Sequence, residues 1–200
     1  MKKPIPDATQ SHILTTAWDL IQREGRQDIG LSDIAAAAGV SRQTLFLAFG
    51  NRAGLLLAMV RHKDGQTDHV ARLRAQGALP CTPTNFMGSL AIWLDYLPVV
   101  YPVAILLDAA GITETEAAQA INDRMKGALL SNFRRQITVI GAEGGLHPGA
   151  NPKAVADRIW SSVHLQAWRL LVLDCGWSPQ EFTKDRLAQA ATCFPALTPD

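Results

Sequence analysis

The sequence lacks the motifs on which most metalloproteins and hydrolases are built. Its three cysteines, Cys81, Cys175 and Cys193, are far apart and form no CxxC pair, which favours reduced structural thiols over a disulfide framework or a zinc site. His62 and His69 are seven residues apart, which is not the i,i+4 spacing that places two metal ligands on one helix face. No nucleophile elbow, phosphate-binding glycine loop or HExxH motif is found. We therefore expect neither an enzyme nor a bound metal or cofactor.

Long hydrophobic runs are also missing. The longest strongly apolar run, Leu97 to Leu107, is roughly half a membrane span and contains Pro98 and Pro102, so it is typical of a protein core. Near the first residue, Pro4 and Pro6 stand where the apolar segment of a secretory signal would begin. With 48% hydrophobic residues, the chain is apolar enough to bury a sizeable core. These features predict a soluble, cytoplasmic protein with no membrane association.

The charge is nearly balanced overall, but it is unevenly distributed. The formal net charge is +1, yet the first 63 residues carry eight Lys or Arg and only five Asp or Glu. No acidic residue lies between Asp33 and Asp64. The basic residues in this window are Arg42, Arg52, Arg61 and Lys63. A basic segment of this kind is a weak indication of a surface that contacts a polyanion.

Helix-capping residues recur at helical intervals and no strand-like alternation is present, so the sequence predicts an all-α fold. In the first third we expect four helices, at 7–25, 32–38, 41–49 and 51–76. Behind a turn at 77–83 we expect helices at 84–97, 102–110, 114–141, 152–175 and 179–194. The expected domains are a three-helix domain over residues 1–50 and a larger helical domain over residues 51–200, with helix 51–76 connecting the two.

Residues 31–46, LSDIAAAAGVSRQTLF, have the spacing of a helix-turn-helix. Ala35 is small enough to let two helices cross closely, and Gly39 can adopt the positive φ that the turn requires. The apolar residues that would pack the two helices together are Ile34, Val40 and Leu45. The second helix is then presented to solvent rather than buried.

The first turn of that second helix carries side chains suited to DNA. Arg42 can pair bidentately with guanine and Gln43 with adenine, and Thr44 can reach a base edge or a phosphate. The helix start at Ser41 directs the positive end of the helix dipole toward a DNA backbone. Short Ala-rich helices joined by glycine also occur in many helical bundles, so the motif alone leaves bundle packing open as an alternative.

A longer pattern surrounds the motif, with ILTTA at 13–17, SDIAAAAGVS at 32–41, TLF at 44–46 and FGNR at 49–52. Over residues 10–60 this pattern resembles the N-terminal DNA-binding domain of TetR-family transcriptional regulators. The resemblance implies that the residues facing the DNA groove are Arg42, Gln43 and Leu47. It also implies that the residues contacting DNA at or beside its backbone are Ser32, Thr44 and Arg52.

Three positions depart from the family pattern. Phe46 and Ala48 stand where the family usually has Tyr and His, and Arg52 stands where Lys is commoner. Phe46 stays among the candidate DNA-binding residues, together with Ser41, but neither Phe46 nor Ala48 can bond to a phosphate. The function implied is a ligand-responsive repressor that binds a palindromic operator as a homodimer. The alternative is a helical ligand-binding or partner-binding dimer whose DNA-reading surface has degenerated.

Two opposite stripes on the expected helix 152–175 predict that it is covered on two sides. One stripe holds Val155, Ile159, Val163, Gln166, Leu170 and Leu173, and the other holds Trp160, His164, Trp168, Leu171 and Cys175. Together with helix 179–194, this helix can form a four-helix interface between two subunits. The other possibility is that both stripes lie inside one monomeric core.

Aromatic residues of the larger domain are candidates for an apolar ligand pocket. They are Trp93, Tyr96, Tyr101, Phe133, Trp160 and Trp168. His164, with a tryptophan four residues away on either side, is the candidate for the polar group that orients an unidentified small-molecule inducer. The alternatives are that the aromatic residues simply form the core and that His164 bonds to the backbone.

Overall fold

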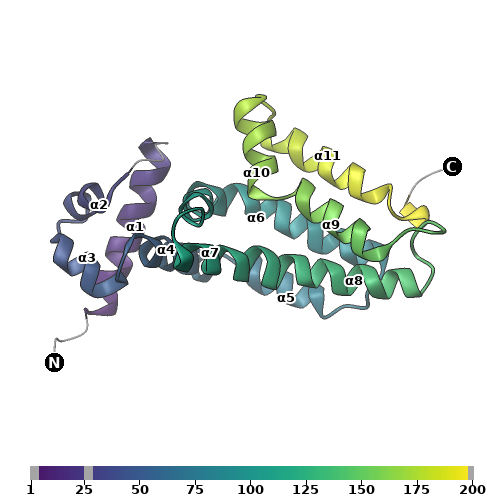
Figure 1. Ribbon diagram of the computed structural model, residues 1–200, viewed down its shortest axis with the longest axis horizontal. Helices are drawn as coiled ribbons and strands as arrows, with labels where there is room; N and C mark the ends of the chain where they lie inside the picture. Colours follow the sequence, from purple (N-terminus) through teal and green to yellow (C-terminus); the bar gives the residue numbers. More distant parts are fainter. Residues whose placement is uncertain (1–4, 25–28, 198–200) are drawn as a thin grey trace. The chain divides into compact units, whose positions relative to one another are not determined.

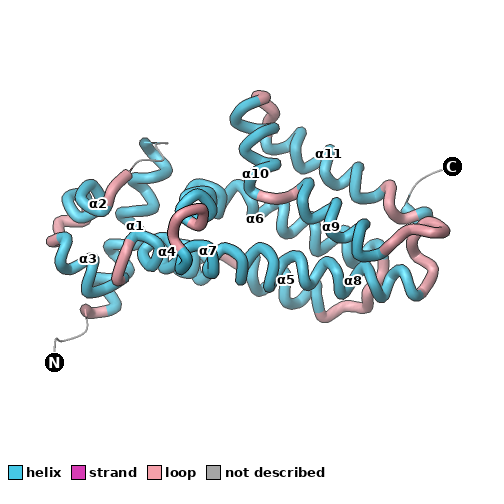
Figure 2. The backbone as a smooth tube through the Cα atoms, in the orientation of Figure 1, coloured by secondary structure: helices cyan, strands magenta, loops and turns pink. Residues whose placement is uncertain are grey.

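The computed structural model describes residues 5–24 and 29–197, and every regular element in these two ranges is helical. Figures 1 and 2 show these helices and the loops that join them. The predicted all-α class is therefore confirmed. By their internal contacts the residues form two compact units. Unit 1 consists of the chain up to Thr67 together with Val100–Ile121, and unit 2 consists of Asp68–Val99 and the residues from Asn122 onward.

Unit 1 opens with four helices where the sequence predicts four. They are α1 (Asp7–Glu24), α2 (Leu31–Ala37), α3 (Arg42–Phe49) and α4 (Arg52–Gln66). Both α1 and α3 pack on α2 and α4. The side chains at the centre are Ile13, Ala17, Ile34, Leu45, Leu55 and Met59, all at most 2% exposed. The expected end of the first helix at Gly25 lies outside the described residues.

The long helix α6 (Pro83–Ala110) corrects the prediction of two helices at 84–97 and 102–110. Pro98 and Pro102 each remove a backbone hydrogen bond, but Leu97, Val100 and Val103 around them are at most 2% exposed, and this burial holds the helix together. Unit 1 also contains α7 (Thr115–Asn122) up to Ile121. The loop between α6 and α7 is therefore part of the same compact unit as α1 to α4.

By length and composition, α6 is the one described helix that could cross a membrane by itself. The bent pair of α3 and α4, at 69° to each other, passes the same test only when counted as one span. Within the most apolar window of α6, 67% is buried inside the protein. This burial is typical of a core helix, in agreement with the interpretation of the apolar run 97–107 as core.

Unit 2 contains the first part of α6 and the remaining helices. These are α5 (His69–Gly77), η1 (Asp123–Leu130), α8 (Ser131–Ala142), α9 (Pro152–Ser162), α10 (Leu165–Trp168), η2 (Arg169–Asp174), α11 (Pro179–Ala191) and η3 (Pro195–Leu197). α8 lies along α9, and an aromatic cluster closes the core. In that cluster the ring of Phe86 lies 5.2 Å from Phe133 and 5.6 Å from Phe194, measured between ring centroids.

The expected helix 51–76 is wrong as a single helix, because it ends at Gln66 and a second helix, α5, begins at His69. Thr67 lies between them with extended backbone (φ −124°, ψ 159°). Its hydroxyl donates a hydrogen bond to the carbonyl of Lys63 at 3.3 Å, and so takes an acceptor that a continuing helix would need. The final helix also differs, since α11 ends at Ala191 and not at 194.

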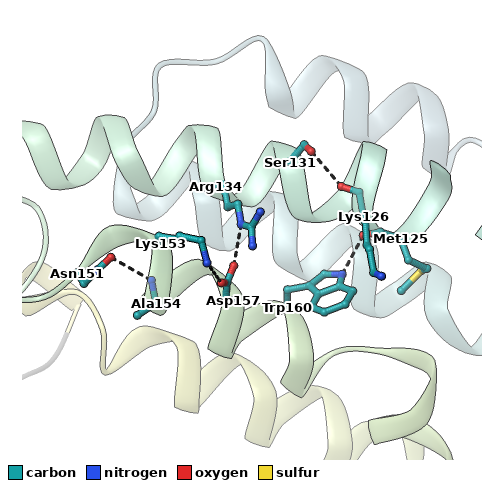
Figure 3. Close-up of polar contacts among 9 residues, drawn as sticks. All are labelled: Met125, Lys126, Ser131, Arg134, Asn151, Lys153, Ala154, Asp157 and Trp160. Atoms are coloured by element: carbon teal, nitrogen blue, oxygen red, sulfur yellow. Dashed lines mark hydrogen bonds and ion pairs between the residues drawn. The ribbon is translucent and has the colours of Figure 1, made fainter. Parts of the chain in front are cut away.

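Two further predicted helices are irregular because tryptophan side chains bond to their backbones. The predicted helix 114–141 contains the π-helical stretch η1, where Trp160 Nε1 donates to the carbonyl of Met125 at 2.9 Å (Figure 3). The predicted helix 152–175 breaks after Ser162 and ends in the π-helical stretch η2. At this break Trp93 Nε1 donates to the carbonyl of Val163 at 3.0 Å. Both indoles satisfy carbonyls that a regular α-helix would occupy itself.

Candidate nucleic-acid interface

The turn between α2 and α3 is shaped by glycine and by side-chain caps. Gly39 has φ +64°, as expected for the turn residue, and L side chains rarely adopt this conformation. Ser41 has extended backbone, and its Oγ accepts a hydrogen bond from the N–H of Thr44 at 3.0 Å. The hydroxyls of Ser41 and Thr44 also lie 2.9 Å apart. These bonds end the turn sharply and start α3 at Arg42.

The outer face of α3 is the exposed surface that the motif predicts. Arg42 and Gln43 on the first turn are exposed, and so are Phe46 (66%) and Leu47 (48%) one turn later. Leu45, on the opposite face, is 2% exposed and anchors the helix in unit 1. Since residues four apart lie above one another on a helix, the four exposed side chains form one continuous surface.

The electrostatics of this surface suit a polyanion. Neither the first nor the last turn of α3 carries an acidic residue. The free N–H groups at its start give the positive end of the helix dipole, and the guanidinium of Arg42 adds a full charge. Ser32 is exposed on α2, whereas Thr44 and Arg52 are half-buried. Ser41 and Thr44 hold the helix start, so any contact they make with DNA is additional to this capping role.

The corner between α3 and α4 contains contacts that the sequence only partly predicts. Asn51 caps α4 as expected, with its Oδ1 accepting from the N–H of Gly54 at 2.8 Å. Its Nδ2 donates to Glu116 Oε2 at the start of α7, at 2.6 Å. Gly54 has no room for a side chain, because a Cβ there would overlap the carbonyl oxygen of Phe49. Glu116 is 65 residues from Asn51, and no local signal in the sequence indicates this pair.

Most candidate ligand-binding aromatics are core residues. Trp93, Tyr96, Phe133 and Trp168 are buried in unit 2, Trp160 is half-buried there, and Tyr101 is buried in unit 1. Because the helix breaks after Ser162, His164 does not lie on one continuous helix with Trp160 and Trp168. Its Nδ1 accepts from the N–H of Gln166 at 3.3 Å and caps α10.

His69 is a half-buried polar residue, and in the sequence it stands out only as a candidate metal ligand, which its spacing from His62 makes unsuitable. Its Nε2 lies 3.1 Å from Asp95 Oδ2, and its ring stacks on Tyr96 with centroids 4.8 Å apart. A hydrogen bond from Arg72 and another from His69 lower the pKa of Asp95, while partial burial opposes them. Since Nε2 faces the carboxylate of Asp95, Nδ1 is the ring nitrogen that remains for another partner. Nδ1 is buried and has no hydrogen-bond partner among the described residues.

The predicted dimer helices separate into buried and exposed faces. Val155, Ile159 and Val163 of the first stripe are buried. Leu170 and Leu173, further along the same stripe, are 54% and 58% exposed on η2. Cys175 of the second stripe is also exposed. An exposed apolar pair next to α11 is the part of unit 2 that a partner subunit could cover.

In the described residues, α2, the turn at Gly39 and α3 have the geometry of a helix-turn-helix, and the outer face of the second helix is exposed. Residues 13–59 match the family model described as bacterial regulatory proteins, tetR family. This match confirms, for this segment, the resemblance seen in the sequence. No curated protein sequence matches the chain with statistical significance.

Solved structures show the same fold over nearly the whole chain. A TetR-family regulator from Rhodococcus sp. is 20% identical, with a TM-score of 0.64 over 93% of this chain and 98% of that one. The fatty acid degradation regulator FadR from Bacillus halodurans is 22% identical, with a TM-score of 0.65 over 94% and 96%. FadR from Bacillus subtilis in complex with stearoyl-CoA is 20% identical, with a TM-score of 0.66 over 90% and 96%. The chain therefore shares the fold of these solved structures over nearly its whole length.

Proposed function

We propose that this protein is a ligand-responsive transcriptional repressor that binds a palindromic operator as a homodimer. The observation that carries the proposal is the outer face of α3, where Arg42, Gln43, Phe46 and Leu47 are exposed on a firmly capped helix. A helix of this kind fits the major groove, with its first turn at the base edges. We assign DNA binding to residues 1–50 and regulation and dimerisation to residues 51–200.

The residues proposed to contact DNA have separate roles. Arg42 and Gln43 would read base edges, because their side chains offer paired donors or a donor and an acceptor. Ser32 and Arg52 would bond to the phosphate backbone and fix the position of the domain. Ser41 and Thr44 would add contacts from the start of α3, where the helix dipole favours a phosphate.

Dimerisation is proposed through the segments 152–175 and 179–194, which hold α9, α10, η2 and α11. The exposed Leu170 and Leu173 support this assignment, since burial of two such side chains against a second copy would be favourable. An interface between two identical subunits has two-fold symmetry. Two copies of α3 related by that symmetry would read two half-sites of a palindrome about one helical turn of DNA apart.

Regulation is proposed to act through an apolar small molecule bound in unit 2. The lining would come from Trp93, Tyr96, Phe133, Trp160 and Trp168, whereas the sixth candidate, Tyr101, belongs to unit 1. His69, whose buried Nδ1 has no hydrogen-bond partner among the described residues, is a second candidate, besides His164, for the polar group that orients the ligand. FadR from Bacillus subtilis was solved with stearoyl-CoA, which is consistent with an apolar ligand. Release of DNA requires the ligand to prefer one conformation, typically by about 1–3 kcal/mol.

Selection of bound sequences from a random duplex pool, followed by affinity measurements across a salt series, tests the proposal. We expect a two-fold symmetric site whose affinity falls steeply as salt rises, because phosphate contacts release counterions. Weak, uniform binding with no enriched site would contradict the proposal. That result would favour the alternative of a ligand-binding or partner-binding dimer whose DNA-reading surface has degenerated. The lack of phosphate-bonding groups at Phe46 and Ala48 supports this alternative.

A further inference from the structure

Two large apolar side chains are exposed side by side on the second turn of α3. Phe46 is 66% exposed and Leu47 is 48% exposed, although Leu45 next to them is 2% exposed. The inner face of α3 is therefore well packed, and only its outer face is exposed to solvent. The corresponding positions of the first turn carry Arg42 and Gln43, so the outer face is polar at its start and apolar one turn later.

An apolar side chain restricts what this part of the helix can contact in DNA. The ring of Phe46 and the side chain of Leu47 have no hydrogen-bonding group. Pressed against a phosphate or a polar base edge, they would remove water and replace none of its hydrogen bonds, which is unfavourable. The apolar group that standard bases present in the major groove is the C5-methyl group of thymine.

We infer that Phe46 and Leu47 bind the 5-methyl groups of thymine, so that each half-site of the operator favours thymine opposite the second turn of α3. The inference rests on the proposed DNA-binding function and adds a base preference to it. In this arrangement Arg42 and Gln43 read hydrogen-bonding edges from the first turn. Phe46 and Leu47 recognise one or two neighbouring base pairs by apolar contact alone.

Deoxyuridine differs from thymidine only by the missing 5-methyl group, so it tests this contact directly. Each thymine of the selected operator is replaced by deoxyuridine in both half-sites, and the affinity of the full-length protein is measured. At the contacted positions we expect about a fourfold loss per methyl group, and about sixteenfold for two symmetric positions. At the remaining thymines we expect no change.

Protein variants show whether the two side chains cause the effect. Phe46→Ala and Leu47→Ala should each remove the thymine preference at one position, so that thymine and deoxyuridine operators bind equally there. Ile112→Ala is the matched control, because Ile112 is 85% exposed on the turn between α6 and α7 and should leave the preference intact. Circular dichroism of all three variants checks that they are folded.

Three results would overturn the inference. If the protein binds every deoxyuridine operator as tightly as the parent operator, the methyl groups are not recognised, while the proposed DNA-binding function stands. If the preference persists in both Phe46→Ala and Leu47→Ala, other residues are responsible. If no duplex is bound specifically, the proposed function fails and the inference fails with it.

Discussion

The side chain of Asn51 donates a hydrogen bond of 2.6 Å from Nδ2 to Glu116 Oε2, while its Oδ1 accepts from the N–H of Gly54 at 2.8 Å. One amide therefore caps α4 and joins the start of α4 to the start of α7. Both partners lie in unit 1. Glu116 belongs to the larger predicted domain, residues 51–200, yet it lies in the same compact unit as α3.

Replacing Asn51 with alanine removes both the N-cap of α4 and the hydrogen bond to Glu116. We expect the free energy of unfolding to fall by about 1–2 kcal/mol, because an N-cap contributes roughly this much. Glu116→Ala leaves the cap intact and should cost less than about 1 kcal/mol, since the lost contact is exposed. Urea unfolding of both variants measures the difference. Equal losses would contradict the separate capping role of Asn51.

Two glycines of α4 should respond in opposite ways to substitution by alanine. A Cβ at Gly54 would overlap the carbonyl oxygen of Phe49, so Gly54→Ala should displace the α3–α4 corner and lower stability. Gly65 has open space around it, and Gly65→Ala should raise stability by up to about 1 kcal/mol, as alanine favours helix. Denaturation midpoints of the two variants test this contrast. A stabilised Gly54→Ala variant would show that the corner is not tightly packed.

The hydrogen bond from the indole N–H of Trp93 should contribute more to the free energy of unfolding than the one from Trp160. Trp93→Phe leaves the carbonyl of Val163 without its donor in a buried site, which should cost about 1–3 kcal/mol. The bond from Trp160 to Met125 is only partly buried, so water can replace it, and Trp160→Phe should cost less. Chemical denaturation followed by circular dichroism gives both values. The reverse order would contradict this account of the break after Ser162.

Asp157 should contribute to stability at neutral pH and lose that contribution in acid. Hydrogen bonds from Arg134 first and Lys153 second lower the pKa of Asp157 from 3.8 to about 2 (Figure 3). Their lengths are 2.7 Å in both cases. A lowered folded-state pKa gives stability that is fully present well above pH 3.8 and is lost as the pH falls through about 2.

The variant Asp157→Asn isolates this contribution. Its unfolding free energy should lie below that of the parent protein at pH 6, and the two should converge near pH 2. Lys153→Met should shift the pKa of Asp157 less than Arg134→Met, as measured by NMR titration. A constant difference between Asp157→Asn and the parent across the whole pH range would contradict the cause given for the low pKa.

Local signals predicted the helix-turn-helix of unit 1 well. The cap at Ser41, the positive φ at Gly39 and the cap at Asn51 each depend on residues within a few positions of one another, so the sequence contains the information. The burial of Leu45 and the exposure of Arg42 follow from helical periodicity. The pairing of Asn51 with Glu116 depends on the tertiary fold and could not be predicted in this way.

Helix boundaries in unit 2 were harder to predict because distant side chains determine them. Periodicity alone predicts one helix over 152–175. The helix instead breaks after Ser162, and the indole of Trp93, from α6, donates a hydrogen bond to the backbone carbonyl of Val163 at this break. His164 then caps α10 instead of standing between two tryptophans on one face. The buried Nδ1 of His69 was missed for a related reason, since its environment comes from Asp95 and Tyr96, 26 and 27 positions away.

The most direct test of the central claim is the operator discrimination of the double variant Arg42→Ala with Gln43→Ala. Both side chains are exposed, so the variant should remain folded and keep the oligomeric state of the parent protein. Affinities for the selected operator and for a scrambled duplex of the same length give the discrimination ratio of each protein. We predict a large ratio for the parent protein and a ratio close to one for the variant. An unchanged ratio in a folded double variant would show that α3 does not read the DNA sequence.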